Sequence, residues 1–179
     1  MKKEHSRCLK RIIAAALVLL TVSGAVPVQP IAQTFSTAIT ASAAEITDSG
    51  EFDNGVKWTL DSEGKLTVSG EGEIHDFAFC NLSAIKSVVI ENGIKSIGYG
   101  AFADCQSLTS VTIPGSVTII DYGAFAYCYS LTSVTISDGV ESIGNYAFYS
   151  CRSLTSVTIP KNVTSIGSDT FYSWFARQK

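Results

Sequence analysis

Histidine is almost absent from this 179-residue chain, which contains only two. His5 lies in a basic N-terminal segment, so His75 is the only imidazole in the rest of the chain. A Ser-His or Cys-His mechanism needs a base beside its nucleophile, and carboxylate pairs with a glycosidase spacing are also missing. No glycine-rich phosphate-binding loop occurs either. The sequence therefore predicts a chain that is not an enzyme and carries no cofactor.

Basic residues are scarce after the N-terminal segment. Residues 45–76 carry nine acidic side chains against two lysines, a net charge of −7, while residues 77–179 carry six acidic and six basic side chains. Binding to nucleic acid or to an anionic membrane surface depends on clustered Lys and Arg. Neither partner is expected for this chain.

Long apolar runs are confined to the first 44 residues. A basic stretch ending at Arg11 precedes a mostly apolar run of 15 residues, 12–26, and Ala41, Ser42 and Ala43 follow. This order is typical of a secretory signal peptide, and the run is shorter than the roughly 20 residues that span a bilayer. We predict a signal peptide over residues 1–44, an extracellular or cell-surface location, and no membrane insertion of the mature chain. An uncleaved anchor is the alternative.

The abundant feature of the sequence is a repeat of 23 residues. Phenylalanine recurs with this spacing at Phe79, Phe102, Phe125, Phe148 and Phe171. Other apolar columns keep the same register, one of them formed by Val88, Val111, Val134 and Val157. A fixed period in this range indicates a solenoid, in which each unit buries its apolar face by stacking on its neighbours.

Each unit divides into three parts. The segment Leu108–Ile113 is apolar at its first, fourth and sixth positions, and its Val and Thr residues favour an extended backbone. A second apolar pair, Val117 and Ile120, indicates another short extended piece. Residues 121–128 combine Ala, Phe and Cys in a way that predicts a short helical turn. We expect a right-handed coil with one parallel β-sheet formed by the longer strands.

These repeats resemble the BspA-like family of bacterial leucine-rich-repeat surface proteins. The matching residues are Leu131-Thr-Ser-Val-Thr-Ile136, Val140-Glu-Ser-Ile-Gly144, Ala147-Phe148 and Cys151-Arg-Ser-Leu154. The resemblance covers about residues 80 to 179. It implies a leucine-rich-repeat solenoid over residues 78–179, of a kind found in surface or secreted modules that bind varied ligands.

The repeat pattern changes near the C-terminus. Trp174 replaces the cysteine of the unit, Arg177 replaces its leucine, and the chain stops at Lys179 without a polar terminal repeat. We expect a truncated array with further repeats or domains beyond Lys179. An improvised cap formed by Trp174 and Phe175 is the alternative.

A β-hairpin is predicted within residues 45–77. Apolar and polar residues alternate over 56–60 and again over 66–68, and Gly64 closes the intervening turn. Such a hairpin would cover the first coil, whose core and strand edge are otherwise open. The Asp53-Asn-Gly55 turn is acidic enough to raise calcium binding as an alternative, but Asp, Asn and Gly are ordinary turn residues, and we predict no metal site.

Four cysteines follow the predicted signal peptide: Cys80, Cys105, Cys128 and Cys151. The last three share one column of the repeat, and three residues in one column cannot all pair with one another. Free cysteine behaves as a small buried hydrophobe. We therefore predict a ladder of buried, reduced thiols rather than disulfides or a zinc site.

Tyrosines give the best candidate binding surface. Every tyrosine lies between the second apolar pair of one unit and the strand of the next, whereas the strand face repeats Ser and Thr. Tyrosine offers contact area at low entropic cost together with a hydroxyl, which suits recognition of proteins or sugars. We predict binding of an extracellular protein or glycan, with a structural spacer or an accessory module of a polysaccharide-degrading enzyme as alternatives. The candidate ligand-binding residues are Tyr99, Tyr122, Tyr127, Tyr129, Tyr146 and Tyr149.

Overall fold

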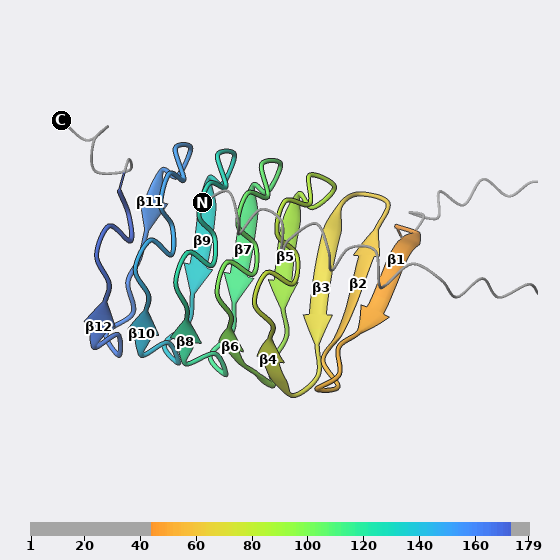
Figure 1. Cartoon of the computed structure of the whole chain (residues 1–179), viewed down its shortest axis with the longest axis horizontal. Coiled ribbons are helices and arrows are strands. Elements are labelled where there is room, and N and C mark those ends of the chain that lie inside the picture. Colours follow the sequence, from red (N-terminus) through yellow and green to blue (C-terminus); the bar gives the residue numbers. More distant parts are fainter. Residues whose placement is uncertain (1–43, 173–179) are drawn as a thin grey trace, which may run out of the picture.

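A computed structural model describes residues 44–172, which form one continuous stack of coils (Figure 1). Residues 1–43 of the predicted signal peptide (1–44) lie outside the described residues. So do Trp174 and Arg177, where the repeat pattern changes. The stack has two sheets, with strand orders β1-β2-β3-β5-β7-β9-β11 and β12-β10-β8-β6-β4. The first sheet contains β1 (Ile46–Glu51), β2 (Lys57–Asp61), β3 (Lys65–Ser69), β5 (Ser87–Ile90), β7 (Ser110–Ile113), β9 (Ser133–Ile136) and β11 (Ser156–Val157). The second contains β4 (Gly72–Ile74), β6 (Ile94–Ile97), β8 (Ile119–Ile120), β10 (Ser142–Ile143) and β12 (Ser165–Ile166).

The longer strands confirm the predicted register. Val88 is paired with Val111, and Val111 with Val134, in parallel strands that are offset by one 23-residue repeat. Within β7, Val111 and Ile113 are buried, and Thr112 between them is exposed. Alternation of this kind places one face of the strand in the core and the other in solvent.

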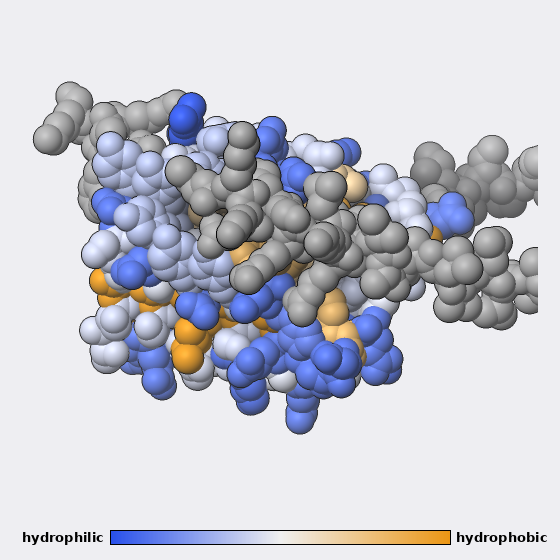
Figure 2. Space-filling model, viewed as in Figure 1, coloured by the Kyte–Doolittle hydropathy of each residue, from blue (hydrophilic) through white to orange (hydrophobic). Residues whose placement is uncertain are grey.

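The second apolar pair of each unit forms a second parallel sheet, where only short extended pieces were predicted. Ile97 is paired with Ile120, and Ile143 with both Ile120 and Ile166. The 23-residue register brings these short pieces into line as well, so their backbone groups pair between coils. At the β12 end the column reaches solvent, and Ile166 is 49% exposed. Figure 2 shows hydrophobic side chains at the surface over this end.

The predicted helical turns are not confirmed, because residues 44–172 contain no helix. Each segment instead forms turns with two left-handed residues four positions apart, such as Gly123 (φ 59°) and Tyr127 (φ 62°). A left-handed residue interrupts an α-helix. Alternate N–H groups donate to the next coil, as from Phe102 to the Ala124 carbonyl at 2.8 Å. The Ala, Phe and Cys pattern predicted the buried face correctly and the backbone wrongly. With no helix present, this part of the chain also offers no apolar helix long enough to cross a membrane.

The predicted hairpin is confirmed as the antiparallel pair β2–β3, and it continues directly into the coils. β3 pairs in parallel with β5, so the second arm of the hairpin is also the first strand of the solenoid. β1 adds a further antiparallel strand outside β2. The hairpin therefore covers the stack by adding strands to the same sheet.

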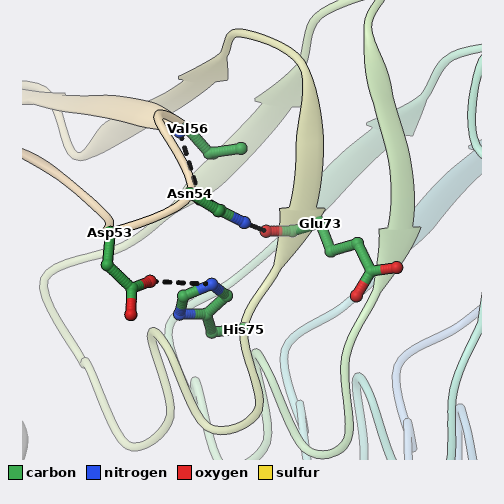
Figure 3. A network of polar contacts seen from close by, with 5 residues as sticks. All are labelled: Asp53, Asn54, Val56, Glu73 and His75. Carbon is green, nitrogen blue, oxygen red and sulfur yellow. Dashed lines mark hydrogen bonds and ion pairs between the residues drawn. The ribbon is translucent and has the colours of Figure 1, made fainter.

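A small polar network holds the β1–β2 turn against β4 (Figure 3). The Asn54 side-chain amide donates to the Glu73 carbonyl at 2.8 Å, and its oxygen accepts from the Val56 N–H at 3.2 Å. Asp53 lies 3.3 Å from His75 Nε2, an ion pair when the imidazole is protonated. Asn54 thus serves as a turn and bridging residue. No group of three or more candidate metal ligands occurs among residues 44–172.

The phenylalanine column forms the centre of the core. Phe102, Phe125 and Phe148 are fully buried and stack with centroids 5.1 and 5.3 Å apart, within 4° of parallel. At the N-terminal end Trp58 packs edge-on against Phe79 at 5.7 Å. The cap therefore closes the aromatic stack as well as the sheet.

The buried thiol ladder is confirmed for the three cysteines of one column, whereas Cys80 is disulfide-bonded and departs from the expectation of reduced thiols. Cys105, Cys128 and Cys151 are free and buried, and each thiol donates to a carbonyl of the preceding coil at 3.1–3.2 Å. Burial raises the pKa of Cys105 and of Cys151 from 9.0 to about 12, and raises that of Cys128 as well. The thiols are therefore poor nucleophiles in the folded chain.

Thiol labelling should distinguish the folded from the unfolded chain. A pKa raised from 9.0 to about 12 lowers the thiolate fraction of Cys105 at neutral pH by about 1,000-fold. We expect the rate of maleimide labelling of the three thiols to be lower by at least that factor in buffer than in denaturant. Mass spectrometry of each cysteine-containing peptide would measure the rates. Fast labelling of Cys128 in buffer would contradict the ladder.

Candidate binding site

The six candidate tyrosines all line one cavity of about 610 Å³ in the turn segments of neighbouring coils. We call this cavity the tyrosine trough. The same cavity is lined by Phe77, by the small residues Gly100, Ala103, Gly123 and Ala126, and by Asn81, Asp104 and Gln106, with Cys80 completing it. Its volume lies in the range of small-molecule and side-chain pockets. The structure thus brings the predicted residues together, and ligand binding by them stays a prediction.

Small residues in two coils form the floor of the trough. Gly100 and Gly123 occupy one repeat column, and Ala103 and Ala126 occupy another three residues later. A Cβ added at Gly123 would meet only the Ala126 Cβ, at 3.8 Å, so the space above Gly123 is open.

Aromatic residues close both ends of the trough, because they occupy the same columns as the floor. One coil earlier Phe77 replaces the glycine, and its ring would lie 2.7 Å from a Cβ at Gly100. One coil later Tyr146 replaces the glycine and Tyr149 replaces the alanine, and their rings touch at 5.4 Å. The trough is therefore two coils long, roughly 10 Å at the usual strand spacing.

The tyrosine rings form a continuous set of contacts along the trough. Tyr99 lies 4.7 Å from Phe77 and 5.0 Å from Tyr122. Tyr127 lies 6.3 Å from Tyr129, which Arg152 covers with its guanidinium at 5.1 Å from the ring centroid. Ring contacts of this kind restrain the side chains before any ligand arrives, which lowers the entropic cost of binding.

Two of these tyrosines have a strained backbone. Tyr127 and Tyr146 have φ of 62° and 58°, in the left-handed region. Their columns hold Gly123 and Asp104 in neighbouring coils, residue types that adopt this conformation at lower cost. A strained residue costs about 1–3 kcal/mol and persists where the surroundings or the function require it. Phe77, at the other end of the trough, has the same left-handed backbone (φ 55°), so strained aromatic residues stand at both ends.

Two of the trough tyrosines, Tyr127 and Tyr146, have a raised pKa. The charge of Asp169 and a hydrogen bond to it raise the pKa of Tyr146. Burial raises the pKa of Tyr127, and the neighbouring tyrosines and Asp104 add to the effect. Asp104 is the one charged side chain in the lining, while Asp169 hydrogen-bonds Tyr146 and Arg152 covers Tyr129 from beside it.

Several lining residues were missed from the sequence. The sequence does not indicate that Phe77, Asp104 or the Gly and Ala residues of the floor line a cavity. Gly and Ala in particular are ordinary residues of turns. The exchange of Gly123 for Tyr146 within one column was visible in the repeat alignment. Tyr172, the remaining tyrosine, is 55% exposed and stacks on Tyr149 outside the trough.

Comparison with known proteins places the chain among bacterial repeat proteins. Residues 72–176 match the family model described as the BspA type leucine rich repeat region, in six copies. No curated protein matches the chain.

Three similar solved structures are leucine-rich-repeat proteins. That of T. pallidum is 24% identical with a TM-score of 0.55, and the match covers 68% of this chain and 66% of that one. That of Eubacterium ventriosum is 31% identical with a TM-score of 0.53, covering 66% and 39%. That of Bacteroides ovatus is 26% identical with a TM-score of 0.52, covering 65% and 37%. The match thus covers no more than 66% of the length of any of these three proteins.

The family model covers more than half of the chain, and its residues coincide with the parallel coils of the structure. The repeat period, the two sheets and the buried phenylalanine and cysteine columns therefore have one explanation: the chain belongs to the family of BspA-type leucine-rich-repeat proteins.

Proposed function

We propose that this chain is a non-catalytic recognition module that binds an extracellular protein or glycan in the tyrosine trough. The observation that carries the proposal is the pair Tyr127 and Tyr146, which hold strained backbones at the wall and end of one cavity. Large aromatic side chains supply much of the energy of protein interfaces. Fold stability gives no reason for Tyr at positions where neighbouring coils have Gly or Asp, whereas ligand contact does.

The proposed location is the extracellular space or the cell surface. The basic, apolar and small-residue segments of residues 1–44 support secretion. The buried, reduced thiols are compatible with that environment, because burial protects them from oxidation.

The rigid scaffold supports recognition by the trough. Three rows of backbone hydrogen bonds join each coil to the next, in the two sheets and in the turn segments. The trough residues are therefore fixed on ordered backbone, and binding requires little reorganisation. The same rigidity supports the alternative of a structural spacer, which would hold other parts of a longer protein apart.

Replacing the strained tyrosines separates binding from folding. We expect Tyr127→Asn combined with Tyr146→Gly to abolish capture on protein and glycan arrays. The melting temperature should fall by no more than a few degrees, because Asn and Gly relieve left-handed strain as ring contacts are lost. Array capture and thermal unfolding of the two proteins check this.

The matched control changes the strand face. Thr112→Ser with Thr135→Ser alters two exposed positions that are far along each coil from the trough segments. Retained capture is expected. If capture instead depends on these threonines and survives the tyrosine changes, the sheet is the recognition face. If the wild-type chain captures nothing, the spacer alternative is favoured.

A further inference from the structure

Four tyrosines at the C-terminal end of the trough form a box around Gly123 and Ala126. Tyr122, Tyr146, Tyr149 and Tyr127 follow one another with ring centroids 5.3, 5.4 and 5.5 Å apart. Tyr122 is also close enough to Tyr127 for the two phenols to interact electrostatically. Three successive ring contacts thus join the four tyrosines in a row beside the open floor.

The ring angles make this a box and not a stack. Successive rings are inclined by 51°, 66° and 75°, in contrast to the phenylalanine column, whose central rings lie within 4° of parallel. Inclined rings can turn several faces toward one enclosed volume. The face of an aromatic ring carries the negative part of its quadrupole, which attracts a cation within about 6 Å of the centroid.

The net charge of the chain favours the same class of ligand, although most of it lies at the N-terminal cap and Arg152 already covers Tyr129. Asp104 lines the trough, and no Lys or Arg is among its lining residues. Residues 44–172 hold fifteen acidic and six basic side chains, a net charge of −9. Figure 2 shows hydrophilic side chains gathered over the β2–β4 end of the view, where the acidic excess of the cap lies. A field of this sign raises the association rate of a positively charged partner.

We propose that the tyrosine box binds a cationic side chain, Arg or Lys, that projects from a basic segment of a partner protein. The apolar stem of such a side chain suits the Gly and Ala floor, while its charged head meets the ring faces and Asp104. The two-coil length of the trough limits the occupant to about one side chain and its flanking backbone. This inference rests on the proposed recognition function and specifies its ligand as protein with positive charge.

Matched peptides test the role of charge. Isothermal titration of the purified protein would compare acetyl-Gly-Gly-Arg-Gly-Gly-amide with the same peptide containing citrulline, which has nearly the same shape and no charge. We expect the citrulline peptide to bind about tenfold more weakly, in line with a desolvated cation–π contact. Asp104→Asn should weaken the Arg peptide, and its own fold should persist because Asn accepts the left-handed backbone of residue 104 (φ 61°).

Two changes at one position test the role of the ring face. Tyr122 is 40% exposed, so its replacement should leave folding intact. Tyr122→Phe keeps the ring and should retain Arg-peptide binding, whereas Tyr122→Leu keeps apolar bulk without the ring and should lose about tenfold. Tyr172→Leu, outside the trough, should have no effect.

Three results would overturn the proposal. They are equal binding of the Arg and citrulline peptides, equal losses for Tyr122→Phe and Tyr122→Leu, and array capture of neutral glycans in the trough with no binding of the Arg peptide. In the third case the proposed recognition function stands and only the ligand class is wrong. Absence of both peptide binding and array capture would overturn both proposals.

Discussion

Phe125→Ala is expected to lower the free energy of unfolding by about 3–5 kcal/mol, the usual range for truncating a buried phenylalanine. Phe125 is fully buried at mid-stack, with Phe102 on one side at 5.1 Å and Phe148 on the other at 5.3 Å. The closely packed coils cannot collapse into the cavity, because their spacing is fixed by hydrogen bonds on three sides. Urea unfolding followed by circular dichroism measures the loss.

The end of the column supplies the control. Phe171 is 7% exposed and stacks on Phe148 at 5.4 Å, whereas Phe125 is fully buried. Phe171→Ala should therefore cost clearly less than Phe125→Ala under the same conditions. Equal losses would contradict the expectation that the partly exposed position contributes less.

Alkaline pH is expected to destabilise the fold strongly, between about pH 9 and pH 12. The pKa of Cys105 and of Cys151 is raised to about 12 by burial, while an unfolded thiol titrates near 9.0. Above pH 9 the unfolded chain loses protons that the folded chain retains, so the equilibrium shifts toward unfolding. The stabilisation is fully present below pH 9 and is lost as the pH rises toward 12.

The size of this effect follows from the number of buried thiols. Each contributes a slope of about 1.4 kcal/mol per pH unit within the window. Cys128 adds to the effect, because its pKa is raised in the same direction. Unfolding free energies measured from pH 8 to 11 check the slope.

Replacing the thiols identifies their share. Cys105→Ala with Cys151→Ala should reduce the slope above pH 9 by about two thirds of the thiol contribution, whatever it does to stability at pH 7. An unchanged slope would mean that other groups, such as the tyrosines with raised pKa, cause the alkaline loss.

Much of the fold could be predicted from the sequence because identical side chains recur at fixed spacing. The Phe column, the Val column and the Cys column each predicted a buried row, and each row is buried in the structure except at Val157, which is partly buried. The turn segments could not be predicted in the same way. Ala, Phe and Cys report burial, whereas the left-handed residues at Tyr127 and Tyr146 are of a type that seldom adopts this backbone.

The candidate site could be predicted only in part, for a related reason. In the sequence every tyrosine lies on one arc of the coil, and in the structure the six candidate tyrosines line one cavity. The shape of that cavity depends on the positions of small side chains. The roles of Gly123 and Ala126 appear only when the coils are stacked. The closure of the ends by Phe77 and Tyr146 likewise depends on contacts between residues one repeat apart.

The length of the trough is counted in whole coils. Gly100 and Gly123 leave two successive steps of one column without a side chain of their own. The Phe77 ring lies over Gly100 at one end, and Tyr146 ends the opening at the other. An array of this kind can lengthen, shorten or divide its cavity by exchanging Gly for an aromatic residue at one position per repeat. The buried Phe column behind that position need not change. On the proposed function, recognition and stability depend on separate columns of the repeat, so ligand size could diverge between relatives while the scaffold stays the same.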